Sequence, residues 1–314
     1  MKRTIALLLF LSLFLLACKP SVAGGERPTD TEAALAAVRI GTQGIDINFV
    51  PNYPPAVVYD QNELTALVEV HNRGNHPLEA TDCFVQITGF DPNIIQGGFN
   101  VPRSCTENIG TLEGKTVYNI QGSQNQMEFR STSITLPPNV FDYNPMLNVK
   151  ACYTYHTKAS PQVCLDPLVY QITSEQKACD YRTPISAGGG QGAPVGIGYV
   201  QSEMVNGRAI FDINVVNYGT GRIISPDADI RGCDTGLAYT DLDKLRYSVK
   251  LSAGTSIDCK PRDGTVRLFN NQGKIVCTFD IPGSASYQTP LQIDLDYGYI
   301  QSFQRQVRII QTPQ

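Results

Sequence analysis

Leu64-Thr-Ala-Leu-Val-Glu-Val-His-Asn-Arg-Gly74 is the most informative stretch for the fold class, because its apolar residues recur at every second position. A side-chain period of two is typical of a β-strand with one buried face. The ending Asn72-Arg73-Gly74 predicts a turn, since glycine tolerates a positive φ. The pattern returns 145 residues later as Ala209-Ile-Phe-Asp-Ile-Asn-Val-Val-Asn-Tyr-Gly219. The sequence therefore contains two copies of one strand-and-turn unit.

Further blocks repeat in the same order along the chain. Residues 134–137 match 279–282 at the same spacing, and then the spacing falls by one, so that 147–155 lies over 291–299 and 162–165 over 306–309. Short strands separated by turn signals, with no long amphipathic helix, predict a sandwich or a barrel. We therefore expect an all-β protein with two tandem immunoglobulin-like β-sandwich domains.

The repeat and the breaks in composition set the expected boundaries. These are a signal peptide at 1–17, a lipidated tether at 18–44, the first sandwich at 45–178, a Gly-rich linker at 179–194 and the second sandwich at 195–314.

Two short motifs carry a resemblance to a known family. Ile45-Asp-Ile-Asn-Phe49 is followed by Pro54-Pro55 and then by the alternating strand that ends in Asn-x-Gly. Gln191-Gly-Ala-Pro-Val195 opens the second copy in a similar way. Together they resemble the immunoglobulin-like domains of prokaryotic surface proteins, including the cell-adhesion-related CARDB type, over residues 45–310. The resemblance implies a surface-exposed spacer or binding module with no shared catalytic residue.

The N-terminal sequence predicts export and lipid attachment. Lys2 and Arg3 precede the apolar run Ile5 to Leu16, which is too short to span a membrane. Leu15-Leu16-Ala17-Cys18 then reads as a bacterial lipobox. We expect cleavage before Cys18, a lipid on its thiol and an extracytoplasmic protein tethered to the cell envelope.

The other eight cysteines predict a disulfide framework, because disulfides persist outside the cytoplasm and no Cys-x-x-Cys motif occurs. If 147–155 and 162–165 form a hairpin, Cys152 and Cys164 share its outer face and can be bonded to each other. The other expected pairs are Cys83 with Cys105, Cys259 with Cys277 and, by elimination, Cys179 with Cys233.

Charge and candidate sites narrow the chemistry. The net charge of −4 argues against nucleic acid as a partner. We expect no cofactor. The three histidines, which we interpret as surface residues, have no accompanying nucleophile motif, so we predict that the chain is not an enzyme. No metal site is expected, and Asp227, Asp229 and Asp234 are weak candidates for calcium.

The leading hypothesis is a membrane-anchored surface lipoprotein that acts as a binding, adhesion or spacer module, with a protein or glycan partner at the cell surface. One alternative is a structural or assembly subunit of a cell-envelope complex. Another is a calcium- or glycan-binding protein. Tyr153, Tyr155, Tyr297 and Tyr299 fall on the core-side face of their strands, which favours packing over ligand contact for them.

Overall fold

The computed structural model describes residues 38–170, 177–205, 207–233 and 236–313. We call residues 38–170 the first half and residues 177–313 the second half. The first half holds β1 (Ile45–Phe49), β2 (Val57–Tyr59), β3 (Thr65–Asn72), β4 (Cys83–Thr88), β5 (Ile95–Gln96), β6 (Arg103–Ser104), β7 (Gln124–Arg130), β8 (Ser133–Ile134), β9 (Asp142–Tyr143), β10 (Met146–Ala159) and β11 (Gln162–Leu165). The second half holds β12 (Ile185–Ser186), β13 (Val195–Val205), β14 (Arg208–Asn217), β15 (Arg222–Ile224), the 3-10 helix η2 (Tyr239–Asp241), β16 (Lys244–Leu251), β17 (Thr255–Lys260), β18 (Thr265–Arg267), β19 (Gln272–Asp280), β20 (Tyr287–Gln306) and β21 (Arg308–Ile310). The predicted all-β class is confirmed.

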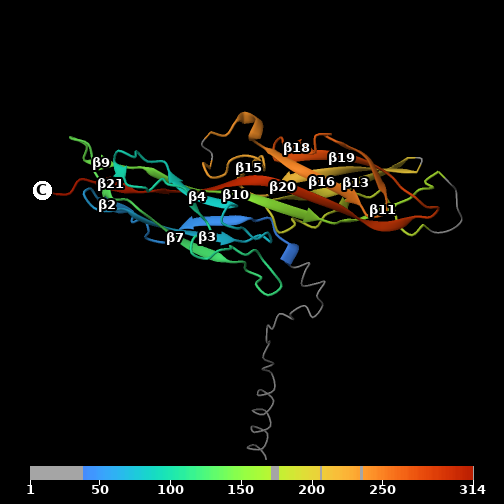
Figure 1. Ribbon diagram of the computed structural model, residues 1–314, viewed down its shortest axis with the longest axis horizontal. Helices are drawn as coiled ribbons and strands as arrows, with labels where there is room; N and C mark the ends of the chain where they lie inside the picture. Colours follow the sequence, from blue (N-terminus) through green and yellow to red (C-terminus); the bar gives the residue numbers. More distant parts are fainter. Residues whose placement is uncertain (1–37, 171–176, 206, 234–235, 314) are drawn as a thin grey trace, which may run out of the picture. The chain divides into compact units, whose positions relative to one another are not determined.

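One eight-stranded sheet crosses from the first half into the second. Its main strand order is β18-β16-β20-β10-β4-β6, and β11 and β15 also pair with β20. Figure 1 shows β10 and β20 running side by side. They pair antiparallel from Met146 opposite Gln306 to Ala159 opposite Ile293. The predicted boundary between the domains is therefore crossed by continuous backbone hydrogen bonding.

The pairing of β10 with β20 is symmetric with respect to the sequence repeat. Thr154 lies opposite Gly298, and these residues occupy equivalent positions, 144 residues apart, in the two copies. Tyr153 lies opposite Tyr299, and Tyr155 lies opposite Tyr297. The two copies therefore associate within one chain as the subunits of a two-fold dimer would, with equivalent surfaces facing each other.

The halves also exchange the strands that follow this pairing. β11 leaves the first half and pairs with the start of β20, where Val163 lies opposite Thr289. β21 returns to the first half, where it pairs antiparallel with β9 and parallel with β2. Val163 and Ile309 are both fully buried. Each half thus completes its core with a strand from the other copy, and the immunoglobulin-like topology of each half stays a prediction.

The strands predicted from the repeated alternating pattern are present. β3 lies between β1 and β7, and β14 lies between β13 and β19. The apolar residues of the repeated pattern, Leu64, Ala66, Val68, Val70, Ala209, Phe211, Ile213 and Val215, are all fully buried. Period-two alternation therefore identified the buried faces correctly.

The predicted match of residues 134–137 with 279–282 is wrong. Val68 faces Met127 on β7, and its repeat equivalent Ile213 faces Ile275 on β19, so these strands are related by a spacing of 148. Ile134 instead pairs with Ile95 in a separate two-stranded sheet. Short apolar alternation recurs in any half-buried strand, so the pattern could not fix this register.

Eight cysteines form four disulfides, and two of the expected pairs are correct. Cys83 is bonded to Cys105, and Cys259 is bonded to Cys277. The other two bonds are Cys152–Cys233 and Cys164–Cys179. The predicted pairs Cys152–Cys164 and Cys179–Cys233 are therefore wrong.

The error arises because residues 147–155 and 162–165 form no hairpin. β11 pairs with β20, which carries Cys164 into the second half near Cys179. Cys152 lies on the face of β10 away from the main core, in a small apolar cluster with Ile224, Ile230 and Cys233. The disulfide Cys152–Cys233 therefore joins the two halves across the shared sheet.

In the described part of the chain, no helix is long and apolar enough to cross a membrane. The predicted signal peptide, Cys18 and most of the predicted tether lie outside the described residues.

Of the two disulfides that join the halves, the one that closes the longer loop should contribute more stability. Cys152–Cys233 closes a loop of 81 residues and Cys164–Cys179 one of 15. The chain-entropy relation gives about 4.5 kcal/mol for the former and about 3 kcal/mol for the latter. We expect the double variant Cys152→Ala/Cys233→Ala to lose more unfolding free energy than Cys164→Ala/Cys179→Ala in urea titrations. Peptide mapping that joined Cys152 to Cys164 would contradict the connectivity.

Candidate functional site

Four buried tyrosines form a cluster at the middle of the antiparallel pairing between β10 and β20. The ring centroids of Tyr153 and Tyr299 are 5.7 Å apart, and those of Tyr155 and Tyr297 are 6.3 Å apart. Tyr153, Tyr155, Tyr297 and Tyr299 are all at least 98% buried, which confirms their predicted core-side position. Buried hydroxyl groups need hydrogen-bond partners, and each of these finds one.

The hydroxyls of Tyr155 and Tyr299 hold the two Asn-x-Gly turns. Tyr155 Oη donates to Asn72 Oδ1 at 3.2 Å and accepts the backbone N–H of His76 at 3.2 Å. Tyr299 Oη donates to Asn217 Oδ1 at 3.0 Å and accepts the backbone N–H of Gly221 at 2.9 Å. Because Asn72 and Asn217 are repeat equivalents, the two copies hold their Asn-x-Gly turns with the same hydrogen bonds.

The glycine of each turn is required for a reason that differs from the predicted one. Gly74 and Gly219 are not among the residues with positive φ. A Cβ on Gly74 would clash with the hydroxyl of Tyr155, and a Cβ on Gly219 would clash with the hydroxyl of Tyr299. Close approach of the tyrosine, and not backbone conformation, therefore excludes a side chain here.

Burial raises the pKa of all four clustered tyrosines. The pKa values of Tyr153 and Tyr297 lie well above the usual value of 10.0, and that of Tyr155 is also raised. Burial raises the pKa of Tyr299 to about 12, although hydrogen bonds from Gly221 and to Asn217 oppose the shift. The cluster is therefore neutral at ordinary pH, which suits its hydrogen-bond donation.

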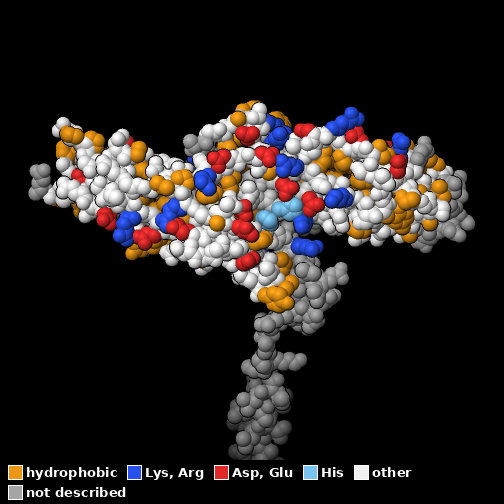
Figure 2. Space-filling model, in the orientation of Figure 1, with side chains coloured by type: hydrophobic (Ala, Val, Ile, Leu, Met, Phe, Trp, Pro, Cys, Tyr) orange, Lys and Arg blue, Asp and Glu red, His pale blue; other side chains and the backbone are white. Residues whose placement is uncertain are grey.

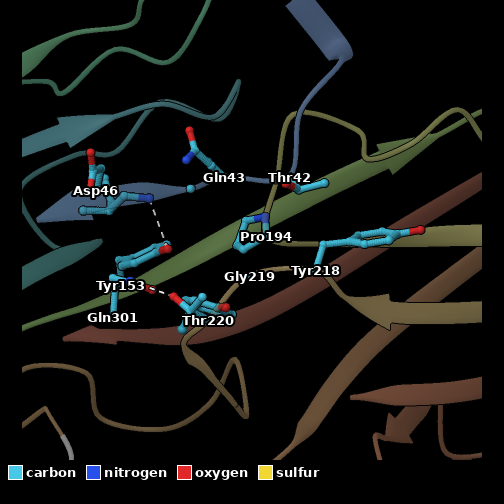
Figure 3. A pocket seen from close by; sticks show the side chains of 12 residues that line it. Thr42, Gln43, Asp46, Tyr153, Pro194, Tyr218, Gly219, Thr220 and Gln301 are labelled. Atoms are coloured by element: carbon cyan, nitrogen blue, oxygen red, sulfur yellow. Dashed lines mark hydrogen bonds between the residues drawn. The ribbon is translucent and has the colours of Figure 1, made fainter. Parts of the chain in front are cut away.

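A cavity of about 170 Å³ opens beside Tyr153 and Tyr299. Figure 3 shows that its walls come from both halves. The first half contributes residues 42–46 and Tyr153, and the second half contributes Pro194, residues 218–220, Tyr299 and Gln301. The halves therefore form this cavity only when β10 and β20 pair.

The chemistry of the cavity is polar with little charge. Hydroxyl and amide groups of Thr42, Gln43, Thr220 and Gln301 line it, and Gln301 Nε2 donates to Thr220 Oγ1 at 3.2 Å. The lining carboxylate is that of Asp46, which accepts a hydrogen bond from Arg73 at 2.9 Å. Tyr218 adds a half-buried aromatic ring. Such a lining suits a neutral polar group with hydrogen-bonding capacity on both sides.

The acidic residues considered for calcium are engaged within the chain where the structure describes them. Asp227 accepts a hydrogen bond from Arg246 at 2.8 Å, and Asp229 Oδ1 accepts the backbone N–H of Arg231 at 2.9 Å. Asp234 lies outside the described residues. Across the described ranges, no three metal-ligating side chains gather in one place.

The structure brings two of the histidines together. The rings of His76 and His156 lie 5.9 Å apart, although 80 residues separate them in the sequence. Both are half-buried, so the interpretation of them as solvated surface residues is wrong. The sequence could not reveal this pair because the turn after β3 meets β10 only in the folded chain. His71, in contrast, lies on the outer side of β3 and contacts the backbone oxygen of Gln121 at 2.8 Å.

Comparison with known proteins gives no family. No family model and no curated protein matches this chain. A solved structure described as the secreted serine protease VesC from Vibrio cholerae matches with a TM-score of 0.19 and 10% identity. The match covers 83% of this chain and 51% of that one, so this chain spans about half the length of the protease chain.

This match overturns the prediction that the chain is not an enzyme, because the similar chain is a serine protease. We withdraw that prediction. At a TM-score of 0.19 the likeness carries no argument for proteolysis either, so we assign no activity from it.

Removing the hydroxyl that holds one turn should destabilise the chain. In Tyr299→Phe the backbone N–H of Gly221 loses its acceptor, and an unmet buried donor costs about 1–3 kcal/mol. Tyr155→Phe should cost a similar amount, because its contacts are equivalent. Urea titrations would measure both. Tyr170→Phe, at an exposed tyrosine, is the control and should change nothing. Unaltered stability in both buried variants would contradict the role of the hydroxyls.

Stability should fall in alkali as the clustered tyrosines ionise. Their pKa is raised in the folded state, so the folded chain keeps its phenol protons where the unfolded chain releases them. The stabilisation is fully present below about pH 10 and is lost as the pH rises from about 10 to about 12. Urea titrations across this range would measure the loss, and phenolate absorbance would show the delayed ionisation. A flat profile in this window would contradict the burial of the cluster.

Proposed function

We propose that this chain is a lipid-anchored binding module of the cell envelope. Four disulfides indicate an oxidising, extracytoplasmic environment. Cys18, the ninth cysteine, stands in the lipobox motif and would supply the anchor. A leader with two basic residues and a short apolar run supports export.

The observation that carries the binding role is the cavity between the halves. Its walls are fixed by a shared sheet, by the turns held through Tyr155 and Tyr299 and by the Cys152–Cys233 bond. A site built on strands and fixed turns loses little conformational entropy when a ligand binds. At about 170 Å³ the cavity is smaller than the roughly 300–1,000 Å³ of drug-sized ligand sites, so it would hold one ring or one side chain of a larger partner.

A glycan is the partner class that this lining favours. Thr42, Gln43, Thr220 and Gln301 offer hydroxyl and amide groups of the kind that bond sugar hydroxyls, and Tyr218 offers an aromatic face.

Anchoring and binding can be separated with two variants of the full chain. Cys18→Ser should lose lipid labelling and move to the soluble exported fraction, yet still bind isolated cell-envelope polysaccharide. Tyr218→Ala should remain anchored and lose most of that binding, by about tenfold, because it removes the aromatic wall of the cavity. Fractionation and sedimentation with the polysaccharide would measure the two properties.

Tyr199→Ala is the matched control, because Tyr199 is also a partly exposed tyrosine of the second half and does not line the cavity. It should keep both anchoring and binding. Membrane attachment of Cys18→Ser would refute the anchor, and undiminished binding by Tyr218→Ala would refute the cavity as the binding site.

A further inference from the structure

A second cavity, of about 350 Å³, lies beside His76, whose ring contacts that of Tyr155, and its lining is basic where that of the first cavity is nearly neutral. Five of its eight lining residues carry basic side chains, namely Arg39, His76, Lys115, His156 and Lys158. Figure 2 shows pale-blue histidine side chains gathered on the displayed face with blue and red side chains close by. The lining residues come from the turn after β3, from the segment before β7, from β10 and from the chain just before β1.

Three of these cations have no carboxylate partner in the described residues. Of the ion pairs found among those residues, none includes Arg39, Lys115 or Lys158. The pKa of Lys115 is lowered by burial and by the charge of Arg73, so its ammonium group is poorly compensated. An arrangement of like charges around a hollow is unfavourable by itself and becomes favourable with an anion in it.

The histidines differ in how their charge is balanced. His156 lies between two carboxylates, with Nδ1 2.5 Å from Asp296 Oδ1 and Nε2 3.3 Å from Asp294 Oδ1. The geometry of the second contact forms no hydrogen bond, so Nε2 is buried without a hydrogen-bond partner. His76 makes no ion pair among the described residues. Asp294 and Asp296 are thus engaged by His156, and the other basic side chains that line the cavity make no ion pair among the described residues.

The repeat shows that the fold does not need these charges. The equivalents of Asn75 and His76 are Thr220 and Gly221, whose backbone makes the same turn contacts through Asn217 and Tyr299. The equivalents of His156 and Lys158 are Ile300 and Ser302. The second half forms the same hydrogen-bonded turn with neutral residues at these positions. The basic residues of the first half therefore have a role other than holding the turn.

We propose that this cavity binds a small oxyanion, a phosphomonoester or a carboxylate-bearing metabolite, through Arg39, Lys115, Lys158 and His76. Arginine and lysine bond phosphate and carboxylate oxygens with charge-assisted hydrogen bonds. The volume falls within the usual range of small-molecule sites, about 300–1,000 Å³. The inference stands independently of the proposed glycan site and of the lipid anchor.

Binding should strengthen as the pH falls. The pKa of His76 is lowered by burial and by the nearby charges of His156 and Lys158, and it is raised in part by Asp82 and Asp296. The carboxylate of Asp294 also lies close to this pair of histidines, with its Oδ1 3.3 Å from Nε2 of His156. A bound anion favours protonated His76 and therefore raises its pKa, so affinity increases as His76 takes up its proton. A shift of one unit gives about a tenfold gain in affinity between pH values above and below the two pKa values.

Calorimetry on the purified full chain tests the proposal with inorganic phosphate and glycerol 3-phosphate as probes. Both should bind at low salt. Affinity expressed per phosphate dianion should be higher at about pH 6 than at about pH 8, because the probes themselves take up a proton with a pKa of about 6. Lys115→Gln/Lys158→Gln should weaken binding about a hundredfold or more, because two charge-assisted bonds are lost and each is worth about tenfold. Lys250→Gln, at an exposed lysine of β16 away from this cavity, is the control and should bind normally.

Thermal stability separates a binding role from a structural one. Without an anion, the double variant should melt at the same temperature as the parent or higher, because it removes repulsion among cations. A lower melting temperature together with unchanged phosphate binding would overturn the proposal. Failure of both probes to bind would also overturn it. Binding to vesicles that contain phosphatidylglycerol, without binding of either probe, would show that the basic residues bind a membrane surface and not a free oxyanion.

Discussion

The antiparallel pairing of β10 with β20 joins two equivalent strands of one chain around the position where Thr154 faces Gly298. This pairing forms the continuous sheet, and it brings four tyrosines into one cluster. It also directs β11 and β21 into the half opposite to the copy they belong to. Separation of the halves would therefore expose the tyrosine hydroxyls and remove one strand from each core. Burial of those groups together makes the pairing cooperative with the folding of both halves.

The tyrosine cluster shows how a repeat can hold two different sites. Asn72 with Tyr155 and Asn217 with Tyr299 make the same hydrogen bonds, so both turns are fixed in the same way. The cavity beside Tyr299 is polar and nearly neutral, whereas the cavity beside His76 is basic. Because the shared hydrogen bonds already hold the turns, the flanking side chains were free to diverge. Residues that are alike at equivalent positions of the two copies are therefore those that the fold requires, and residues that differ are available for other roles.

The positions of the strands and their buried faces were predicted well from the sequence. The pairing of the strands with one another, and two of the disulfides, were not. The alternating residues of β3, β10, β14 and β20 face the core as their pattern indicated, because side-chain period is a local property of an extended chain. Two disulfides, Cys83–Cys105 and Cys259–Cys277, join cysteines in the same half and were predicted correctly. The other two depend on which strands pair with β20, because β20 lies beside β10, β11 and β15. A hairpin between neighbouring strands was the simplest expectation, and the exchange of strands replaced it.

The all-β class, the repeat, the core-facing residues and the oxidising environment implied by eight cysteines could all be inferred from the sequence, because each follows from local periodicity or from counting. The folded chain was needed to show that the copies share one sheet, that Cys152 is bonded to Cys233 and that His76 lies beside His156. These contacts join residues about 80 apart or more. They form because apolar burial is non-directional, so strand pairing and packing, and not the local pattern, select which surfaces meet.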